Sequence, residues 1–242
     1  MDRNSLEKAE KILESRIRLL NFSDNHSLKE LLTETLNELE RLTNSKIGFY
    51  HFIEPDQKTL KLQTWSSSTK KYFCKAEGEG QHYDISNAGI WADCVRERKP
   101  IIHNNYSTAK NKKGLPNGHA EIIRELVVTI FRKEKIVAIL GVGNKETDYT
   151  EYDIDMVSQL SDVAWDITER KRIEESLIQS ELHSRHLAEN LINTANVIVA
   201  ALDTNGIIKI FNKTAEKITG YSRNEVIGKN WFDIFTPTDK LP

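Results

Sequence analysis

The strongest constraint on the fold of this chain is a helical pattern that begins at Glu151 and continues for many turns. Apolar residues recur along it at steps of three and four, the spacing that places side chains on one helical face. The buried face of its first part consists of Ile154, Val157, Leu160, Ala164 and Ile167. Between Thr168 and Glu175 the pattern turns strongly charged, but no proline or glycine interrupts it. We therefore expect one helix, capped by Thr150, that leaves a globular domain as a connector.

The connector, residues 171–194, carries a weak repeat of the kind that pairs helices. Its members step by four and three in an a/d-like register that includes two serines. They are Ile173, Leu177, Ser180, Ser184, Leu187 and Leu191. Two interpretations remain open with equal weight: a coiled-coil seam between two copies of the chain, and a single solvated helix.

Two more helices are expected near the N-terminus. In residues 1–26, apolar side chains recur with helical spacing at Leu6, Ala9, Leu13, Ile17 and Leu20. After a break, Ser27 and Glu30 fit a capping box, in which Ser27 caps the helix and Glu30 reaches back to the Ser27 amide. A run of leucines between Leu28 and Leu42 then forms one continuous apolar stripe.

Strands are expected between these helices. Residues 46–65 and residues 125–142 each form a predicted β-hairpin, rich in aromatic and branched side chains. The second hairpin is apolar almost throughout, so its strands should lie at the centre of a sheet. A short helix at about 87–98, capped by Ser86, and a short strand at 100–103 lie between the hairpins. This order predicts an α+β fold in which helices flank a central antiparallel sheet.

The long connection from Trp65 to His119 holds the residues that most suggest a binding site. It is polar and irregular, and it contains both cysteines of the chain. Near its end, residues 114–118 (GLPNG) place two glycines and a proline directly before His119. Glycine allows positive φ and proline fixes φ, so this turn can hold the imidazole in one place. Long ordered connections are usually functional, and we take this one as the candidate sensing segment.

Composition excludes several classes of protein. The formal net charge is −2, so no overall positive field indicates nucleic-acid binding. No apolar run approaches the ~18 residues that a membrane span needs, and the charged N-terminus does not resemble a secretion signal. Two cysteines without a CxxC motif indicate a reducing compartment rather than a disulfide framework or structural zinc. We expect a cytoplasmic protein.

From residue 195 onward the pattern changes again. A third hairpin is predicted around the turn Asp203–Gly206, followed by a short helix that Gly220 ends and by a second helical piece near Ser222. One hairpin with short helices offers too little apolar surface for an independent domain of typical size.

Several local sequences resemble a GAF subfamily found in multidomain prokaryotic sensor kinases. They are IGFYHF (47–52), AGIW (88–91), RKPIIHN (98–104), GLPNGH (114–119) and GVGNK (141–145). The resemblance covers residues 27–170 and leaves residues 1–26 as an N-terminal helix and linker. It implies a GAF-type sheet flanked by helices, with a small molecule or cofactor bound between the sheet and the segment from Trp65 to His119.

The remainder of the chain resembles other parts of such sensors. Residues 166–171 (DITERK) are similar to an exit helix that links sensory modules. Asn212, Ala215, Gly220, Glu225 and Gly228 match the first half of a PAS domain. The strands and helix that complete that family are absent, so the resemblance implies a truncated PAS domain in residues 195–242, or one completed by another chain. Kinase segments are absent too. We therefore expect that this chain has no enzymatic activity of its own. We expect its partner to be a downstream kinase or another output domain.

The resemblance also suggests a cofactor. Some sensor kinases with this kind of GAF domain carry haem, attached to a cysteine and ligated by a histidine further along the chain. These roles would fall on Cys74 and His119, with His119 as the metal ligand. Lys70, Lys71 and Lys75 near Cys74 favour a reactive thiolate. The alternatives are an idle thiol at Cys74 and a histidine that only bonds a loop carbonyl at position 119.

Other side chains are candidates for lining the same site. Trp65, Tyr83 and Trp91 could form walls for a flat ligand, and His103 could contribute an imidazole, but each could equally be a packing residue. Cys94 is expected to pack in the core.

Three functions remain: a ligand-binding sensory module, a haem-based redox or gas sensor, and a ligand-free scaffold for dimerisation. A homodimer through the N-terminal and connector helices is expected.

Overall fold

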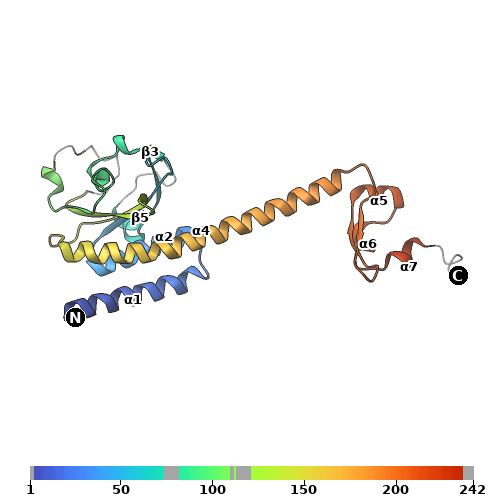
Figure 1. Ribbon diagram of the computed structural model, residues 1–242, viewed down its shortest axis with the longest axis horizontal. Helices are drawn as coiled ribbons and strands as arrows, with labels where there is room; N and C mark the ends of the chain where they lie inside the picture. The colour runs from blue at the N-terminus through green and yellow to red at the C-terminus, as the bar shows by residue number, and fades with distance from the viewer. Residues whose placement is uncertain (1–2, 74–81, 110–111, 113–120, 237–242) are drawn as a thin grey trace. The chain divides into compact units, whose positions relative to one another are not determined.

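The computed structural model of the protein describes residues 3–73, 82–109, 112 and 121–236. The chain divides into two compact units, residues 1–173 and residues 174–242, and we describe each by itself. A single helix of 44 residues, α4 (Glu151–Thr194), belongs to both (Figure 1). The predicted continuation of the exit helix into the connector is therefore confirmed.

The first unit is built on a six-stranded antiparallel sheet with the order β3-β2-β1-β6-β5-β4. The strands are β1 (Ile47–Ile53), β2 (Thr59–Trp65), β3 (His82–Asp84), β4 (Ile101–His103), β5 (Glu125–Arg132) and β6 (Lys135–Gly143). Both predicted hairpins are present, as β1–β2 and β5–β6. The apolar hairpin lies inside the sheet, as expected, because β6 pairs with β1 and β5 pairs with β4.

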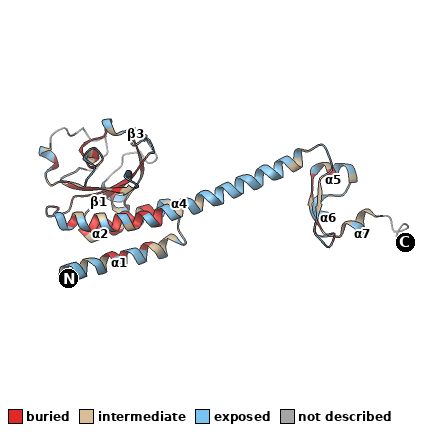
Figure 2. Cartoon of the chain, in the orientation of Figure 1, coloured by how far each residue is buried: buried red, intermediate tan, exposed pale blue. Residues whose placement is uncertain are grey.

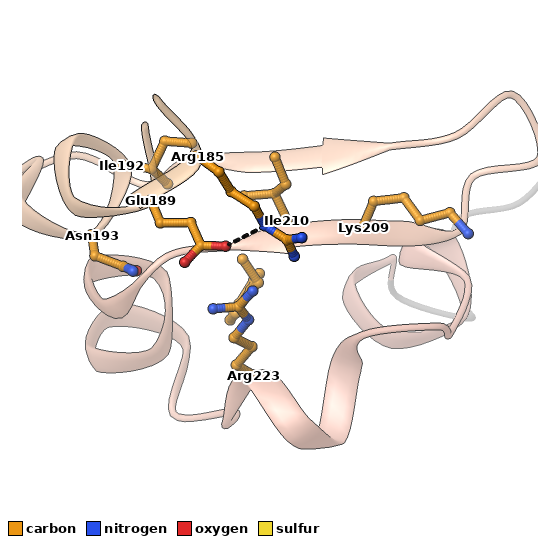
Figure 3. A pocket seen from close by; sticks show the side chains of 8 residues that line it. Arg185, Glu189, Ile192, Asn193, Lys209, Ile210 and Arg223 are labelled. Atoms are coloured by element: carbon orange, nitrogen blue, oxygen red, sulfur yellow. Dashed lines mark hydrogen bonds and ion pairs between the residues drawn. The ribbon is translucent and has the colours of Figure 1, made fainter. Parts of the chain in front are cut away.

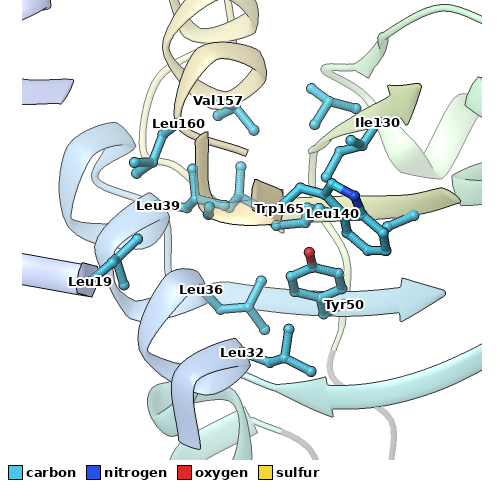
Figure 4. Close-up of a cluster of buried hydrophobic side chains, with 14 of the residues drawn as sticks. Leu19, Leu32, Leu36, Leu39, Tyr50, Ile130, Leu140, Val157, Leu160 and Trp165 are labelled. Carbon is cyan, nitrogen blue, oxygen red and sulfur yellow. The ribbon is translucent and has the colours of Figure 1, made fainter. Parts of the chain in front are cut away.

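One face of the sheet, which we call the helix face, is covered by α2 (Leu28–Thr43) and the first part of α4 (Figure 2). Leucines of both helices meet the strands in one apolar core, in which Leu36, Leu39 and Leu160 are fully buried (Figure 4). Tyr50 and Trp165 fill its centre. Trp165 packs against the strand residue Phe52, with ring centroids 5.5 Å apart. This core fixes α4 to the sheet.

The starts of the two long helices differ from each other. At α2 the predicted capping box is confirmed, with Ser27 and Glu30 bonding each other's amides. At α4 the roles expected for Thr150 are reversed. The Thr150 amide and hydroxyl both donate to the carboxylate of Asp153, at 2.8 and 3.1 Å. Asp153 also pairs with Lys145, so a buried carboxylate secures the first turn.

Helix α1 (Arg3–Ser23) packs on α2 through an unexpected set of residues. Its buried side chains include Ile12, Ser15 and Leu19. Of the stripe that the sequence pattern emphasised, Leu20 packs against the core, but the earlier members are exposed, at 61% for Leu6, 55% for Leu13 and 49% for Ile17. The first part of the stripe is therefore an apolar surface that the described residues leave uncovered.

The helix predicted at about 87–98 is wrong in length. The structure has two single turns, η2 (Ile85–Asn87) and η3 (Ile90–Ala92), followed by α3 (Asp93–Glu97). Ser86 does not act as the cap; its amide instead donates to the Asp84 carboxylate. The chain is extended at Ala88 and Gly89, and this break separates the turns.

The second unit contains the end of α4, a hairpin and three short helices. Its elements are β7 (Ala200–Leu202), β8 (Ile208–Phe211), α5 (Lys213–Thr219), α6 (Arg223–Val226) and α7 (Trp231–Phe235). Gly220 ends α5 with a φ of +81°, as the sequence predicted. Its core is small, with Ile208, Phe211, Ala215 and Val226 buried.

One side chain organises the second unit. The amide of Asn212, which is fully buried, donates to the carbonyls of Ile192 and Val197 and accepts from the amides of Val199 and Ala215. It thereby connects the last turn of α4, the hairpin and the start of α5.

Candidate functional site

The face of the sheet opposite the helices, which we call the site face, is where the sequence predicted a ligand. Strand β1 serves both faces, because its side chains alternate. Tyr50 and Phe52 point to the helix face, while Phe49 joins the core cluster of the opposite face. His51 is 6% exposed and pairs with Ile139 of β6. Adjacent residues of one strand therefore contact α4 and the site face.

An aromatic group forms the centre of the site face. The rings of His51 and Trp91 are stacked, with centroids 4.7 Å apart and an angle of 25° between the planes. Phe49 meets both edge-on, at 5.4 Å from His51 and 5.8 Å from Trp91. Burial lowers the pKa of His51 to about 3, so its imidazole is neutral at physiological pH. The group is therefore uncharged, and the stacked rings of His51 and Trp91 cover each other.

Phe49 needs a glycine opposite it. A Cβ atom on Gly141 would lie 2.2 Å from Cζ of Phe49, far inside contact distance. Since Gly141 pairs with Phe49 across β1 and β6, the missing side chain is what lets the ring lie flat over the sheet.

Trp91 is held in place by Arg96. The Arg96 guanidinium donates to the backbone carbonyls of Ile85, Ala88 and Gly89 at 2.7–3.1 Å, and it also pairs with Asp93. One charged group thus fixes the loop on which Trp91 sits, and multiple charge-assisted bonds of this kind are strong.

A second polar group lies at the β4 edge of the sheet. His103 Nδ1 is 3.0 Å from Oε1 of Glu125, and its Nε2 is 3.9 Å from a carboxylate oxygen of Asp93. The Glu125 side chain is 4% exposed. Hydrogen bonding to Glu125 raises the pKa of His103, which favours the imidazolium. The pair joins β4 to β5 and to α3.

Cys94 packs in this region and is fully buried, as predicted. Burial raises the pKa of its thiol, and the charge of Glu125 acts in the same direction. Since the thiolate is the reactive form of cysteine, this side chain is inert.

The predicted site residues fall into three groups. Trp91 and His103 belong to the groups just described, and Trp65 is half-buried on β2, opposite Phe49. Tyr83 lies on β3, where its backbone pairs with Leu60. Cys74 and His119 lie outside the described residues, so the haem hypothesis, which depends on both, stays a prediction.

Phe49 and His51 were not predicted as site residues, although both belong to the IGFYHF sequence. Strand alternation alone would have placed them on the same face. That this face is the site face depends on which side of the sheet the helices cover, and this is a tertiary property.

The second unit has a separate groove, with a volume of about 210 Å³, between the end of α4, β8 and α6 (Figure 3). Its charged lining residues are Arg185, Glu189, Lys209 and Arg223. Two of the cations already have carboxylate partners, Glu189 for Arg185 and Asp203 for Lys209, and both are more than half exposed. We therefore place the candidate site on the sheet of the first unit.

A family model described as GAF domain matches residues 25–169, more than half of the chain. The chain belongs to the GAF domain family. A second model, described as PAS fold, matches residues 187–241. The GAF domain is therefore followed by a PAS segment, as the sequence motifs predicted.

Two curated relatives are sensors. The chain is 37% identical over 180 residues to a methyl sulfide methyltransferase-associated sensor of Methanosarcina acetivorans, an overlap of 73% of this chain and 18% of that protein. It is 35% identical over 71 residues to the sensor protein FixL of Bradyrhizobium diazoefficiens, covering 29% of this chain and 13% of FixL. The chain thus spans less than a fifth of either relative. Together with the GAF and PAS matches, these relatives identify it as a sensory module.

Solved GAF domains share the fold. The GAF domain of a phosphoenolpyruvate-protein phosphotransferase from Coxiella burnetii matches with a TM-score of 0.57 and 12% identity, over 69% of this chain and 98% of that one. The GAF domain of the Acinetobacter phosphoenolpyruvate-protein phosphotransferase matches with a TM-score of 0.50 and 17% identity, over 69% of this chain and 95% of that one. In the described part of the chain, no helix is long and apolar enough to cross a membrane.

Proposed function

We propose that this chain is the non-catalytic sensory region of a longer signal-transduction protein. A small molecule binds on the site face of the GAF sheet, and α4 carries the bound state toward the PAS segment and a downstream kinase or other output domain. The observation that carries the proposal is the double role of β1. Phe49 and His51 meet Trp91 on the site face, while Phe52, the next residue along the strand, meets Trp165 of α4 on the helix face.

The aromatic group favours a flat and largely uncharged ligand. The neutral His51 brings no charge to the site. Thr129 of β5 adds a hydroxyl that is buried and has no hydrogen-bond partner among the described residues. It pairs with Ile139, the same residue that pairs with His51, so both polar groups lie in one row across the sheet. A ligand with a polar atom placed over Thr129 fits this row.

Transmission through α4 is supported by how that helix is fixed. The Arg132 guanidinium of β5 binds Asp162 and Asp166 at 2.5 and 2.6 Å. Arg172, further along α4, lies over the ring of Phe52, 4.7 Å from its centre. A ligand that favours one position of β1 would therefore favour one position of α4, and a ligand signals only by such a difference between states.

Dimerisation through α1 and residues 171–194 is part of the proposal. The a/d-like residues of the connector are exposed, with 59% for Leu177, 52% for Leu187 and 63% for Leu191. The exposed stripe of α1 adds further apolar surface that a second copy could cover. Parallel pairing would bring the two connectors side by side.

Ligand binding is tested on the chain as purified, by comparing its mass under native and denaturing conditions. We expect a small molecule that is lost on denaturation, and we expect Gly141→Val, which crowds Phe49, to lose it. Trp231→Phe in the second unit serves as the control and should retain it. Two results together would contradict ligand binding. The wild-type chain would carry no small molecule, and a panel of small molecules would shift the melting temperatures of the wild type and of Gly141→Val equally. The fold would then act only as a scaffold.

Dimerisation is tested with single cysteines at Leu177 or Leu187 in a Cys74→Ser background. Both should cross-link between subunits, while a cysteine at Gln179, outside the a/d register, should not. Absence of cross-links at both seam positions contradicts the parallel dimer without affecting the ligand proposal.

A further inference from the structure

Helix α2 buries two glutamates with contrasting surroundings. Glu38 and Glu40 are 5% and 8% exposed. Glu38 is bound by two guanidinium groups, from Arg18 at 2.9 Å and Arg41 at 2.7 Å, and its pKa is lowered to about 2. Glu40 forms no ion pair with any described residue, and its Oε1 atom has no hydrogen-bond partner among them. Burial raises the pKa of Glu40, and a carboxylate that stays ionised there requires a countercharge, which the described side chains do not supply.

Hydroxyl groups take the place of cations around Glu40. Ser68 donates to Oε2 of Glu40, and Ser66 lies beside the same carboxyl. The Ser66 hydroxyl is fully buried, and it is 3.4 Å from that of Ser68 and 2.7 Å from that of Thr69. All three residues belong to the run that follows β2.

The run is rigidly attached to its surroundings. The Ser66 amide donates to the carbonyl of Gly48 at 2.9 Å, and the Gly48 amide donates to the Thr69 hydroxyl at 2.8 Å. Asn37 of α2 bonds both the amide and the hydroxyl of Ser67. The oxygens around Glu40 are therefore preorganised by a helix, a strand and a turn.

Gly48 provides the space at this position. A Cβ atom there would lie 3.3 Å from Oε1 of Glu40 and 3.5 Å from Cβ of Ser66. The unpartnered oxygen therefore faces the one position of β1 that has no side chain. Lys70 approaches the outer side of the group, where it donates to Thr64 at 2.8 Å.

We propose that Glu40, Ser66 and Ser68 form a binding site for a monovalent alkali cation, with sodium as the best fit. Oxygen ligands select hard cations, and a single carboxylate matches a single positive charge better than the two charges of Ca²⁺ or Mg²⁺. A cation that holds oxygens at about 2.4 Å places two ligands at right angles roughly 3.4 Å apart. The Ser66 and Ser68 hydroxyls have this separation.

The site would connect cation binding to the sensing segment. Residues 66–69 lead directly into η1 (Thr69–Phe73), which precedes Cys74 in the sequence. A bound cation would fix this run against α2 and β1 and so restrict one end of the segment. This role does not depend on the identity of the ligand on the site face.

The test is thermal unfolding of the whole chain in equal concentrations of lithium, sodium, potassium and caesium chloride, which have the same ionic strength. Sodium at about ten times its dissociation constant should raise the melting temperature of the first unit by about 3–5 °C above caesium. Glu40→Gln should abolish this difference. Gly48→Ala should abolish it too, since it fills the space but keeps the carboxylate. Glu38→Gln is the matched control, because it removes a buried charge from the same helix and should keep the sodium effect.

Three results would overturn the proposal. Equal stabilisation by all four salts would indicate general screening. A sodium effect that survives Glu40→Gln would place the ion elsewhere. No sodium effect, with Glu40→Gln at least as stable as wild type, would mean that Glu40 is held as a neutral acid. If Glu40→Gln fails to fold, Ser68→Ala takes its place with the same expected loss.

Discussion

The ion pairs of Glu38 allow a quantitative prediction about how α1 is attached. Its carboxylate accepts bonds from Arg18 of α1 and Arg41 of α2, and Ser15 of α1 donates to the same group. These bonds lower its pKa from 4.5 to about 2. One pKa unit corresponds to about 1.4 kcal/mol, so the full shift corresponds to about 3 kcal/mol. Both arginines are close to half exposed, and solvent screening reduces this to about 2 kcal/mol.

We therefore expect Glu38→Gln to lower the free energy of unfolding of the first unit by about 2 kcal/mol at pH 7. The sign follows from the lowered pKa. The stabilisation is fully present above pH 4.5 and is lost as the pH falls toward 2, because the folded state then has to protonate Glu38. Urea denaturation of wild type and variant at several pH values measures the difference. If the difference in unfolding free energy between wild type and variant stays constant between pH 5 and pH 2.5, the electrostatic explanation is refuted. The effect of the substitution would then be due to packing alone.

Other predictions concern the site face. Gly141→Ala should lower the free energy of unfolding by about 1–3 kcal/mol, because the new Cβ displaces Phe49. It should also redshift the fluorescence of Trp91. An unchanged free energy of unfolding would contradict the close contact between Gly141 and Phe49. His103→Gln should remove a stabilisation that is present below pH 6.5 and declines as the pH rises, since the folded pKa of His103 is raised; denaturation at pH 6 and pH 8.5 measures it. If haem binds, added haemin should give a Soret band that His119→Ala alters; a protein that ignores haemin excludes this cofactor.

Much of the fold follows from local patterns in the sequence. The capping box at Ser27, the two hairpins and the uninterrupted α4 each depend on neighbouring residues, and each is confirmed. The helix expected at 87–98 is wrong because the extended chain at Ala88–Gly89 divides it, and because the Arg96 side chain, from the same stretch, satisfies carbonyls at Ile85 and Ala88. Such a side-chain contact leaves no periodic signal in the sequence.

The site was predicted less completely than the fold. Trp91 and His103 were recognised as candidates from their residue types. Their partners, His51 and Glu125, looked like ordinary strand residues, because nothing local distinguishes a buried polar side chain in a strand from a solvated one. The stripe on α1 is the opposite case: its periodicity was recognised, but the packing of α1 on α2 uses other residues, so the stripe faces outward.

The amide of Asn212 has a consequence for what kind of movement can pass into the PAS segment. All of its hydrogen-bonding capacity is used: its nitrogen donates to the carbonyls of Ile192 and Val197, and its oxygen accepts from the amides of Val199 and Ala215. The last turn of α4 therefore cannot swivel about its own axis without breaking a buried bond. If this last turn of α4 rotates, the hairpin and α5 have to rotate with it. A flexible linker at the same place would not transmit the rotation. The junction therefore transmits rotation of the helix, and one side chain supplies four of the hydrogen bonds that hold it.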